Sequence, residues 1–156
     1  MFRPMRRHKQ ALSEAECLAL LQQQPRGVLA VYGEDGYPYA LPMDHLYREG
    51  KLYFHCAKTG HKIDAIAQND HVSFCVMDEG FRREGEWALN IRSVIVFGRL
   101  RPVQAGTDLV PILRALGNKY NPSAEDVERE IEQAIDRVQL LELTIDHMTG
   151  KLVNES

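Results

Sequence analysis

The residues best suited to chemistry occupy positions 54–62, Phe-His-Cys-Ala-Lys-Thr-Gly-His-Lys, where a run of alternating apolar residues ends and a predicted helix begins. A helix start favours an anion, because its first N–H groups have no partner within the helix and the helix dipole is positive there. Gly60 adds backbone freedom, and Lys62 adds a positive charge. Together these features predict a phosphate site. The alternative from spacing alone is a plain turn with a solvated lysine.

A second candidate is the preceding extended segment, residues 38–43, Pro-Tyr-Ala-Leu-Pro-Met. Each proline removes one backbone donor, so the segment is predicted to be an edge strand or the mouth of a barrel. Its free backbone groups could meet the edge of a flat heteroaromatic ring, with Tyr39 or Met43 packed beside that ring. An equal alternative is an edge strand that its prolines protect from aggregation.

The motifs of several common enzyme classes are missing from the sequence. It has no Gly-x-Ser-x-Gly for a hydrolase, no Gly-x-Gly-x-x-Gly for a Rossmann unit and no P-loop. We expect no dedicated metal site, because no histidine pair has His-x-x-x-His spacing and no cysteine pair has Cys-x-x-Cys spacing. The cysteines are expected to be buried thiols: Cys17, Cys56 and Cys75.

Length and composition fit one domain, residues 1–156, with residues 1–12 as an N-terminal arm. No apolar run approaches the ~20 residues that cross a bilayer. The formal net charge of −3 argues against a general nucleic-acid binder. The basic start is followed by no apolar stretch of the kind a secretory signal has, so we expect a cytoplasmic protein without membrane or nucleic-acid partners. The arm is expected to be solvated or to dock a dimer, with a nucleic-acid contact as the alternative.

Periodicity predicts a mainly β protein with peripheral helices. The expected helices are residues 13–24, 60–69, 109–119 and 124–137, and about six antiparallel strands are expected at 27–32, 37–47, 52–56, 72–77, 93–100 and 140–147. Ser13 and Glu16 form a capping box, and Gly98 is a predicted bulge. Sequential pairing is the simplest topology. The absence of a βαβ rhythm favours a closed or nearly closed barrel.

Four motifs, taken in order, resemble one family closely: residues 38–42, residues 53–57 with Gly60-His61-Lys62, residues 93–98 and residues 148–151. The chain is identified by them as similar to the Nim group, the nitroimidazole-resistance flavoproteins of the pyridoxamine 5'-phosphate oxidase-like superfamily. The resemblance covers nearly the whole chain, including its N-terminal Met-Phe-Arg-Pro-Met-Arg-Arg.

The resemblance implies a split β-barrel that binds FMN at the interface of a homodimer. By position, Lys62 and His61 would hold the FMN phosphate, with Gly60 providing backbone space. The remaining implied contacts are with the flavin ring and the ribityl chain: Met43, Asp44, His55, Cys56, Ala57, Ser93 and, from the neighbouring subunit, Trp87. His55 could also donate a proton to a substrate, and the alternative is a histidine that only packs.

The function implied by the resemblance is an FMN-dependent oxidoreductase that reduces a small planar acceptor such as a nitroimidazole or another nitroaromatic. True pyridoxamine 5'-phosphate oxidase activity is not expected, because residues 151–156 lack the Arg-x-His-type motif of those enzymes. The alternatives are a non-catalytic flavin or haem carrier with the same pocket, and a cofactor-free structural dimer.

Overall fold

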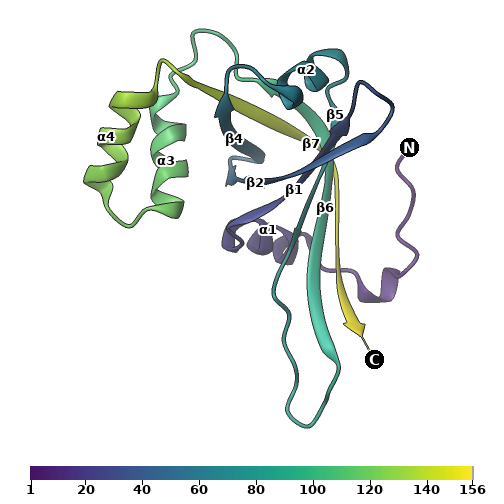
Figure 1. Cartoon of the computed structure of the whole chain (residues 1–156). Coiled ribbons are helices and arrows are strands. Elements are labelled where there is room, and N and C mark those ends of the chain that lie inside the picture. Colours follow the sequence, from purple (N-terminus) through teal and green to yellow (C-terminus); the bar gives the residue numbers. More distant parts are fainter. Residues whose placement is uncertain (156) are drawn as a thin grey trace.

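The fold is a curled antiparallel sheet of seven strands in the order β2-β1-β5-β6-β7-β4-β3 (Figure 1). A computed structural model of the chain describes residues 1–155. The strands are β1 (Arg26–Tyr32), β2 (Pro38–Asp44), β3 (Leu46–Arg48), β4 (Lys51–Ala57), β5 (His71–Met77), β6 (Leu89–Pro102) and β7 (Val138–Glu155). The expected count of about six strands is wrong by one, because the segment 37–47 divides at His45 into two strands.

The expected sequential pairing holds for four steps along the chain: β1 pairs with β2, β3 with β4, β5 with β6, and β6 with β7. It fails between β4 and β5, because β5 pairs with β1 and the second neighbour of β4 is β7. These two pairings join strands that are distant in sequence, and local patterns carry no information about them.

The sheet closes on itself at His45. β2 lies at one edge of the sheet and β3 at the other, yet His45 alone separates them in the chain. The two edges must therefore approach each other at this point, and the sheet curls into a split β-barrel. The predicted split barrel is present, with seven strands in place of about six.

The two longest strands, β6 and β7, pair along nearly their whole length. Their register shifts between Phe97 and Gly98, as expected for a bulge at this glycine. A Cβ atom on Gly98 would lie 2.2 Å from the carbonyl oxygen of Thr144, so only glycine fits. The predicted last strand, residues 140–147, is too short, because Lys151 pairs with Ser93 and β7 continues to Glu155.

The helices cover the sheet, and their starts agree with the sequence. The helices are α1 (Glu14–Gln23), α2 (His61–Gln68), α3 (Val110–Tyr120) and α4 (Ala124–Ala134), preceded by a short 3-10 turn, His8–Gln10. The capping box of α1 is present, since the Glu16 N–H donates to Ser13 Oγ and the Ser13 N–H donates to the Glu16 carboxylate. Within residues 1–155, no helix combines the length and the apolar character needed to span a membrane.

The main core lies between α1 and the inner face of the sheet. Leu21 of α1 is fully buried with Phe54 and Phe74, whose rings meet edge to face at a centroid distance of 5.1 Å. A smaller cluster around Leu113 and Leu140 joins α3 and α4 to the sheet. The helix pair α3–α4 thus stands at one side of the barrel with a core of its own (Figure 1).

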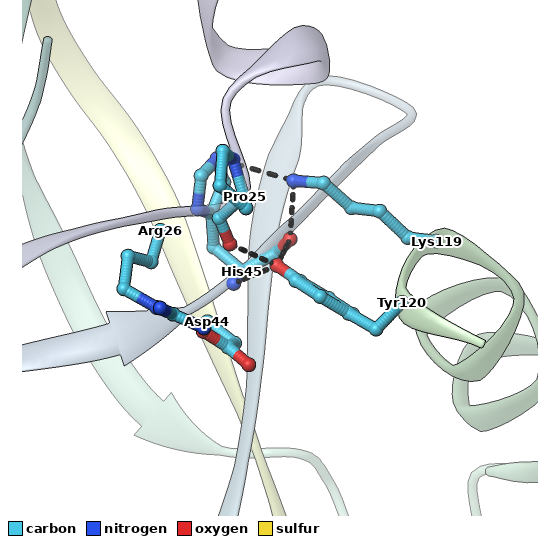
Figure 2. A network of polar contacts seen from close by, with 6 residues as sticks. All are labelled: Pro25, Arg26, Asp44, His45, Lys119 and Tyr120. Atoms are coloured by element: carbon cyan, nitrogen blue, oxygen red, sulfur yellow. Dashed lines mark hydrogen bonds and ion pairs between the residues drawn. The ribbon is translucent and has the colours of Figure 1, made fainter. Parts of the chain in front are cut away.

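A polar network fixes the residue at which the barrel closes (Figure 2). The His45 ring donates from Nε2 to the Leu21 carbonyl oxygen at 2.7 Å, which ties it to α1. The backbone of His45 meets the end of α3, because its N–H donates to Tyr120 Oη at 2.8 Å and its carbonyl accepts from Lys119 Nζ at 2.7 Å. One residue therefore connects two helices to both edges of the sheet.

The burial of this network suppresses its charges. His45 is fully buried, and desolvation, followed by the charge of Lys119, lowers the pKa of its imidazole to about 4. Because Nε2 carries the proton, the lone pair is on Nδ1, which has no hydrogen-bond partner among the described residues. Burial also lowers the pKa of Lys119 to about 8. The closure is therefore held by an imidazole that is neutral near pH 7.

We expect the free energy of unfolding to fall as the pH drops from about 6.5 to about 4. The unfolded chain binds a proton on His45 near its ordinary pKa of 6.5, whereas the folded chain resists that proton down to about pH 4. Acid therefore favours the unfolded state, by on the order of 3 kcal/mol from this residue. Urea unfolding at pH 7 and pH 4.5 measures the loss. His45→Gln, which keeps an N–H donor and cannot titrate, should lose less stability over the same interval; equal losses would contradict the prediction.

Candidate functional site

The start of α2 has the backbone of an anion site. Gly60, the residue before the helix, has φ 138°, which favours glycine, and no side chain caps the first turn. A Cβ atom on Gly60 would meet no atom within 4 Å, so the space in front of the helix is open. The first-turn N–H groups face that space with the positive end of the helix dipole. The predicted phosphate site is thus geometrically available.

The flanks of this site come from different elements. The His61 ring stacks on Tyr39 of β2, with centroids 4.1 Å apart and planes 16° from parallel. Lys62 is half-buried. Burial raises the pKa of the nearby Cys56 thiol, and the positive charge of Lys62 opposes that rise. The proline-containing strand and the start of α2 are therefore adjacent in space, as both candidate segments require.

A cleft of about 420 Å³ lies further along β2 and β4, lined by Arg26, Pro42, Met43, Asp44 and His55. It brings together three of the predicted site residues, Met43, Asp44 and His55, from strands that are far apart in sheet order. Barrel closure creates this proximity.

Arg26 is a member of the cleft that sequence reasoning missed. Its Nε lies 2.8 Å from Asp44 Oδ1, and the two residues are register partners in the β1–β2 hairpin. Hydrogen bonding to this carboxylate raises the pKa of the guanidinium. Counting outward from the turn at residues 33–36 could have revealed the pair, because antiparallel register is set by the turn.

The end of β4 exposes alternate side chains. His55 and Ala57 are exposed, whereas Cys56 is half-buried and packs against the main core. Burial raises the pKa of the Cys56 thiol, with Lys62 opposing the shift, so the thiol is neutral near pH 7. Any contact of Cys56 with a ligand beside β4 would therefore come from its backbone, and His55 and Ala57 present their side chains.

Two predicted site residues lie outside this cleft. Ser93 sits on β6 between its cross-strand partners Met77 and Lys151. In sheet order, β1 and β5 separate β6 from β2, a distance of roughly 14 Å at ~4.8 Å per strand. Trp87 is 77% exposed in the connection between β5 and β6. Within one chain, neither residue joins Asp44 and His55.

The outer face of the sheet carries an exposed apolar patch. It comprises Val28, Tyr32, Met77, Ile95 and Phe97, which are 46%, 62%, 65%, 37% and 39% exposed. Val28, Cys75 and Ile95 follow one another in register across three strands, so the patch is continuous. Contiguous apolar surface of this kind marks an interaction site.

Across residues 1–155, no cluster of three or more His, Cys, Asp or Glu side chains could hold a metal ion. The chemical groups gathered at the site are instead an anion-binding helix start, a lysine, an Arg–Asp pair and an exposed histidine. This set suits an organic ligand with a phosphate at one end and a polar ring at the other.

Known proteins share this architecture. No curated protein matches the chain in sequence. A protein assigned to 5-nitroimidazole antibiotic resistance, from Bacteroides thetaiotaomicron, is 17% identical, with 93% of this chain and 87% of its own covered and a TM-score of 0.72. An FAD-binding protein from Mesorhizobium loti is 23% identical, with 92% and 96% covered and a TM-score of 0.65. The flavocytochrome Anf3 from Azotobacter vinelandii is 18% identical, with 97% and 72% covered and a TM-score of 0.79.

At these identities, the solved structures establish a common fold and nothing finer. The family assignment has a separate basis, because the family model for pyridoxamine 5'-phosphate oxidase matches residues 13–152. That range contains every strand except the last residues of β7, together with the helix start and the cleft. The chain therefore belongs to the pyridoxamine 5'-phosphate oxidase family.

Proposed function

We propose that the protein binds FMN, with the phosphate at the start of α2 and the ring toward the cleft at Asp44. The observation that carries this proposal is the open, uncapped start of α2 at Gly60, which lies next to Lys62. Strand β4 leads from this helix start to the cleft, which His55 lines. Gly60, His61 and Lys62 would hold the phosphate, His55 and Ala57 would line the ribityl chain, and Met43 and Asp44 would border the ring. The FAD-binding relative from Mesorhizobium loti supports a flavin as the ligand class.

The protein is proposed to act as a homodimer, with the outer apolar patch as the interface. Covering Ile95 and Phe97 would remove apolar surface from water at ~25 cal/mol per Å². Ser93 lies on the same strand, two residues before Ile95, and a partner subunit seated there could bring Ser93 and Trp87 to a flavin site that they do not reach within their own chain. The incompleteness of the site in one chain supports this arrangement.

The proposed activity is reduction of a small planar acceptor such as a nitroimidazole or another nitroaromatic. The flavin, once reduced by a two-electron donor such as a reduced nicotinamide, would supply a hydride. A nitro group that accepts a hydride and one further proton loses water and becomes a nitroso group, which balances two electrons and two protons. His55 is exposed at the cleft and can hold the second proton. The relative from Bacteroides thetaiotaomicron supports this acceptor class.

Lys62→Ala should weaken FMN binding by ~1.5–3 kcal/mol, because a charge-assisted hydrogen bond to the phosphate is lost. Fluorescence titration of the flavin measures the affinity. Lys58→Ala is the matched control, since Lys58 is an exposed lysine on the same turn and is expected to leave the affinity unchanged. Equal affinities for Lys62→Ala and the unmodified chain would remove Lys62 from the phosphate site.

Stopped-flow mixing of the chemically reduced, flavin-loaded protein with a panel of nitroimidazoles tests the activity. We expect flavin reoxidation under anaerobic conditions, followed at the flavin absorbance band. His55→Gln, compared with the unmodified chain when both are saturated with FMN, should slow it at neutral pH. A flavin that stays reduced with every acceptor would favour the non-catalytic carrier.

Ile95→Glu should convert the dimer into a monomer and weaken flavin binding, because a carboxylate would be buried within the apolar patch. Light scattering after size-exclusion chromatography measures the mass. Gln133→Glu adds the same charge at an exposed position on α4 and should leave the dimer intact. A dimer that persists in Ile95→Glu would place the interface elsewhere.

A further inference from the structure

A second cavity opens beside the proposed flavin site. Its volume is about 340 Å³, within the range of small-ligand pockets. It lies between the α3–α4 pair and the ends of β2, β4 and β7, and most of its wall is aliphatic: Leu113, Leu116, Val127, Ala134, Ile131, Ile135 and Val138.

The apolar wall follows from helical spacing on α4. Val127 and Ile131 line the cavity four residues apart, and Ile135 follows at the next turn. The opposite side of α4 carries exposed polar residues such as Glu132 and Gln133. Arg114 Nη2 donates to Glu128 Oε2 at 3.1 Å, which ties α3 to α4 and holds the wall in place.

The cavity is continuous with the cleft, because Asp44 and His55 line both. A molecule in the cavity would therefore present one end to the same two side chains that border the proposed flavin ring. No other described pocket shares residues with both the cleft and the α3–α4 pair.

The charges of the lining select against anions. Its ionisable side chains are Asp44, His55, Tyr120 and Glu130, and no lysine or arginine lines the cavity. Burial raises the pKa of Tyr120 to about 12, so this hydroxyl stays neutral near pH 7. A ligand with a phosphate or sulfonate would meet aliphatic side chains and the carboxylate of Glu130, while the nearest arginine in the adjoining cleft, Arg26, is already paired with Asp44.

We propose that this cavity binds the acceptor, a neutral aromatic molecule of one or two rings, with its reducible group at the Asp44–His55 end. The inference rests on the proposed function and adds the substrate class: apolar and uncharged. Pyridoxamine phosphate and other anionic ring compounds are excluded by the same charges.

The test is isothermal titration calorimetry of the oxidised full-length protein, with and without saturating FMN. The probe is 2-methyl-1,4-naphthoquinone, a neutral two-ring molecule, and 1,4-naphthoquinone-2-sulfonate is its anionic counterpart. We expect the neutral quinone to bind at least ten-fold more tightly than the sulfonate. Equal binding of the two quinones would overturn the charge selection.

Ile131→Trp should fill the cavity and weaken binding of the neutral quinone by ten-fold or more, with FMN affinity unchanged. The matched control is Gln133→Trp, which adds the same side chain on the exposed side of α4. Unchanged quinone affinity in Ile131→Trp would overturn the inference while leaving FMN binding in place. An unmodified protein that does not bind FMN would instead count against the proposed function.

Glu130→Lys provides a variant that does not depend on repacking the core, because Glu130 is exposed at the edge of the cavity. It should raise the affinity for the sulfonate by several-fold and change the affinity for the neutral quinone little. No change in sulfonate binding would show that the anion does not approach this cavity. If a partner subunit fills the cavity, the quinone would bind only to the monomeric Ile95→Glu variant and not to the unmodified dimer. That result would also overturn the inference.

Discussion

Barrel closure at His45 is the constraint on which the remaining structure depends. A single residue carries the chain from one edge of the sheet to the other, and its buried imidazole and backbone are held by α1 and by the end of α3. Closure places Asp44 beside His55, and it also sets the helix pair next to the same two residues. The cleft and the cavity are therefore both products of one junction, at which His45 is fully buried and neutral near pH 7.

Sequence reasoning succeeded where the determinants are local. The capping box at Ser13, the helix that starts after Gly60 and the bulge at Gly98 each depend on a few neighbouring residues, and all are present. Membership of the pyridoxamine 5'-phosphate oxidase family, within which the four spaced motifs placed the chain, is confirmed by a match over residues 13–152. The split barrel is likewise confirmed, with seven strands in place of about six.

The errors and omissions are all nonlocal. The position of β5 next to β1 and the extension of β7 to Glu155 depend on partners that lie far along the chain. The break at His45 was hidden because the segment 37–47 continues in extended conformation on both sides of it. The role of Arg26 and the cavity under α4 emerge only when strands and helices from distant parts of the chain are packed together. Periodicity describes which face of an element is apolar, and it does not say what that face will meet.

The connection between β5 and β6 is a place where related chains could differ in length. β5 and β6 keep one unbroken register from His71 to Met77, and the connection that carries Trp87 lies beyond its end. The first residues of that connection still pair with β6, since Asp78 bonds Arg92 and Phe81 bridges Asn90, so residues can be gained or lost only beyond Phe81 without moving a strand pair. The bulge at Gly98 shifts the register between β6 and β7, so the pairs on its two sides follow different registers. Variation in length at residues 82–88 would thus be a tolerated route by which related chains acquire different neighbours, while the strands that line the cleft stay under separate selection.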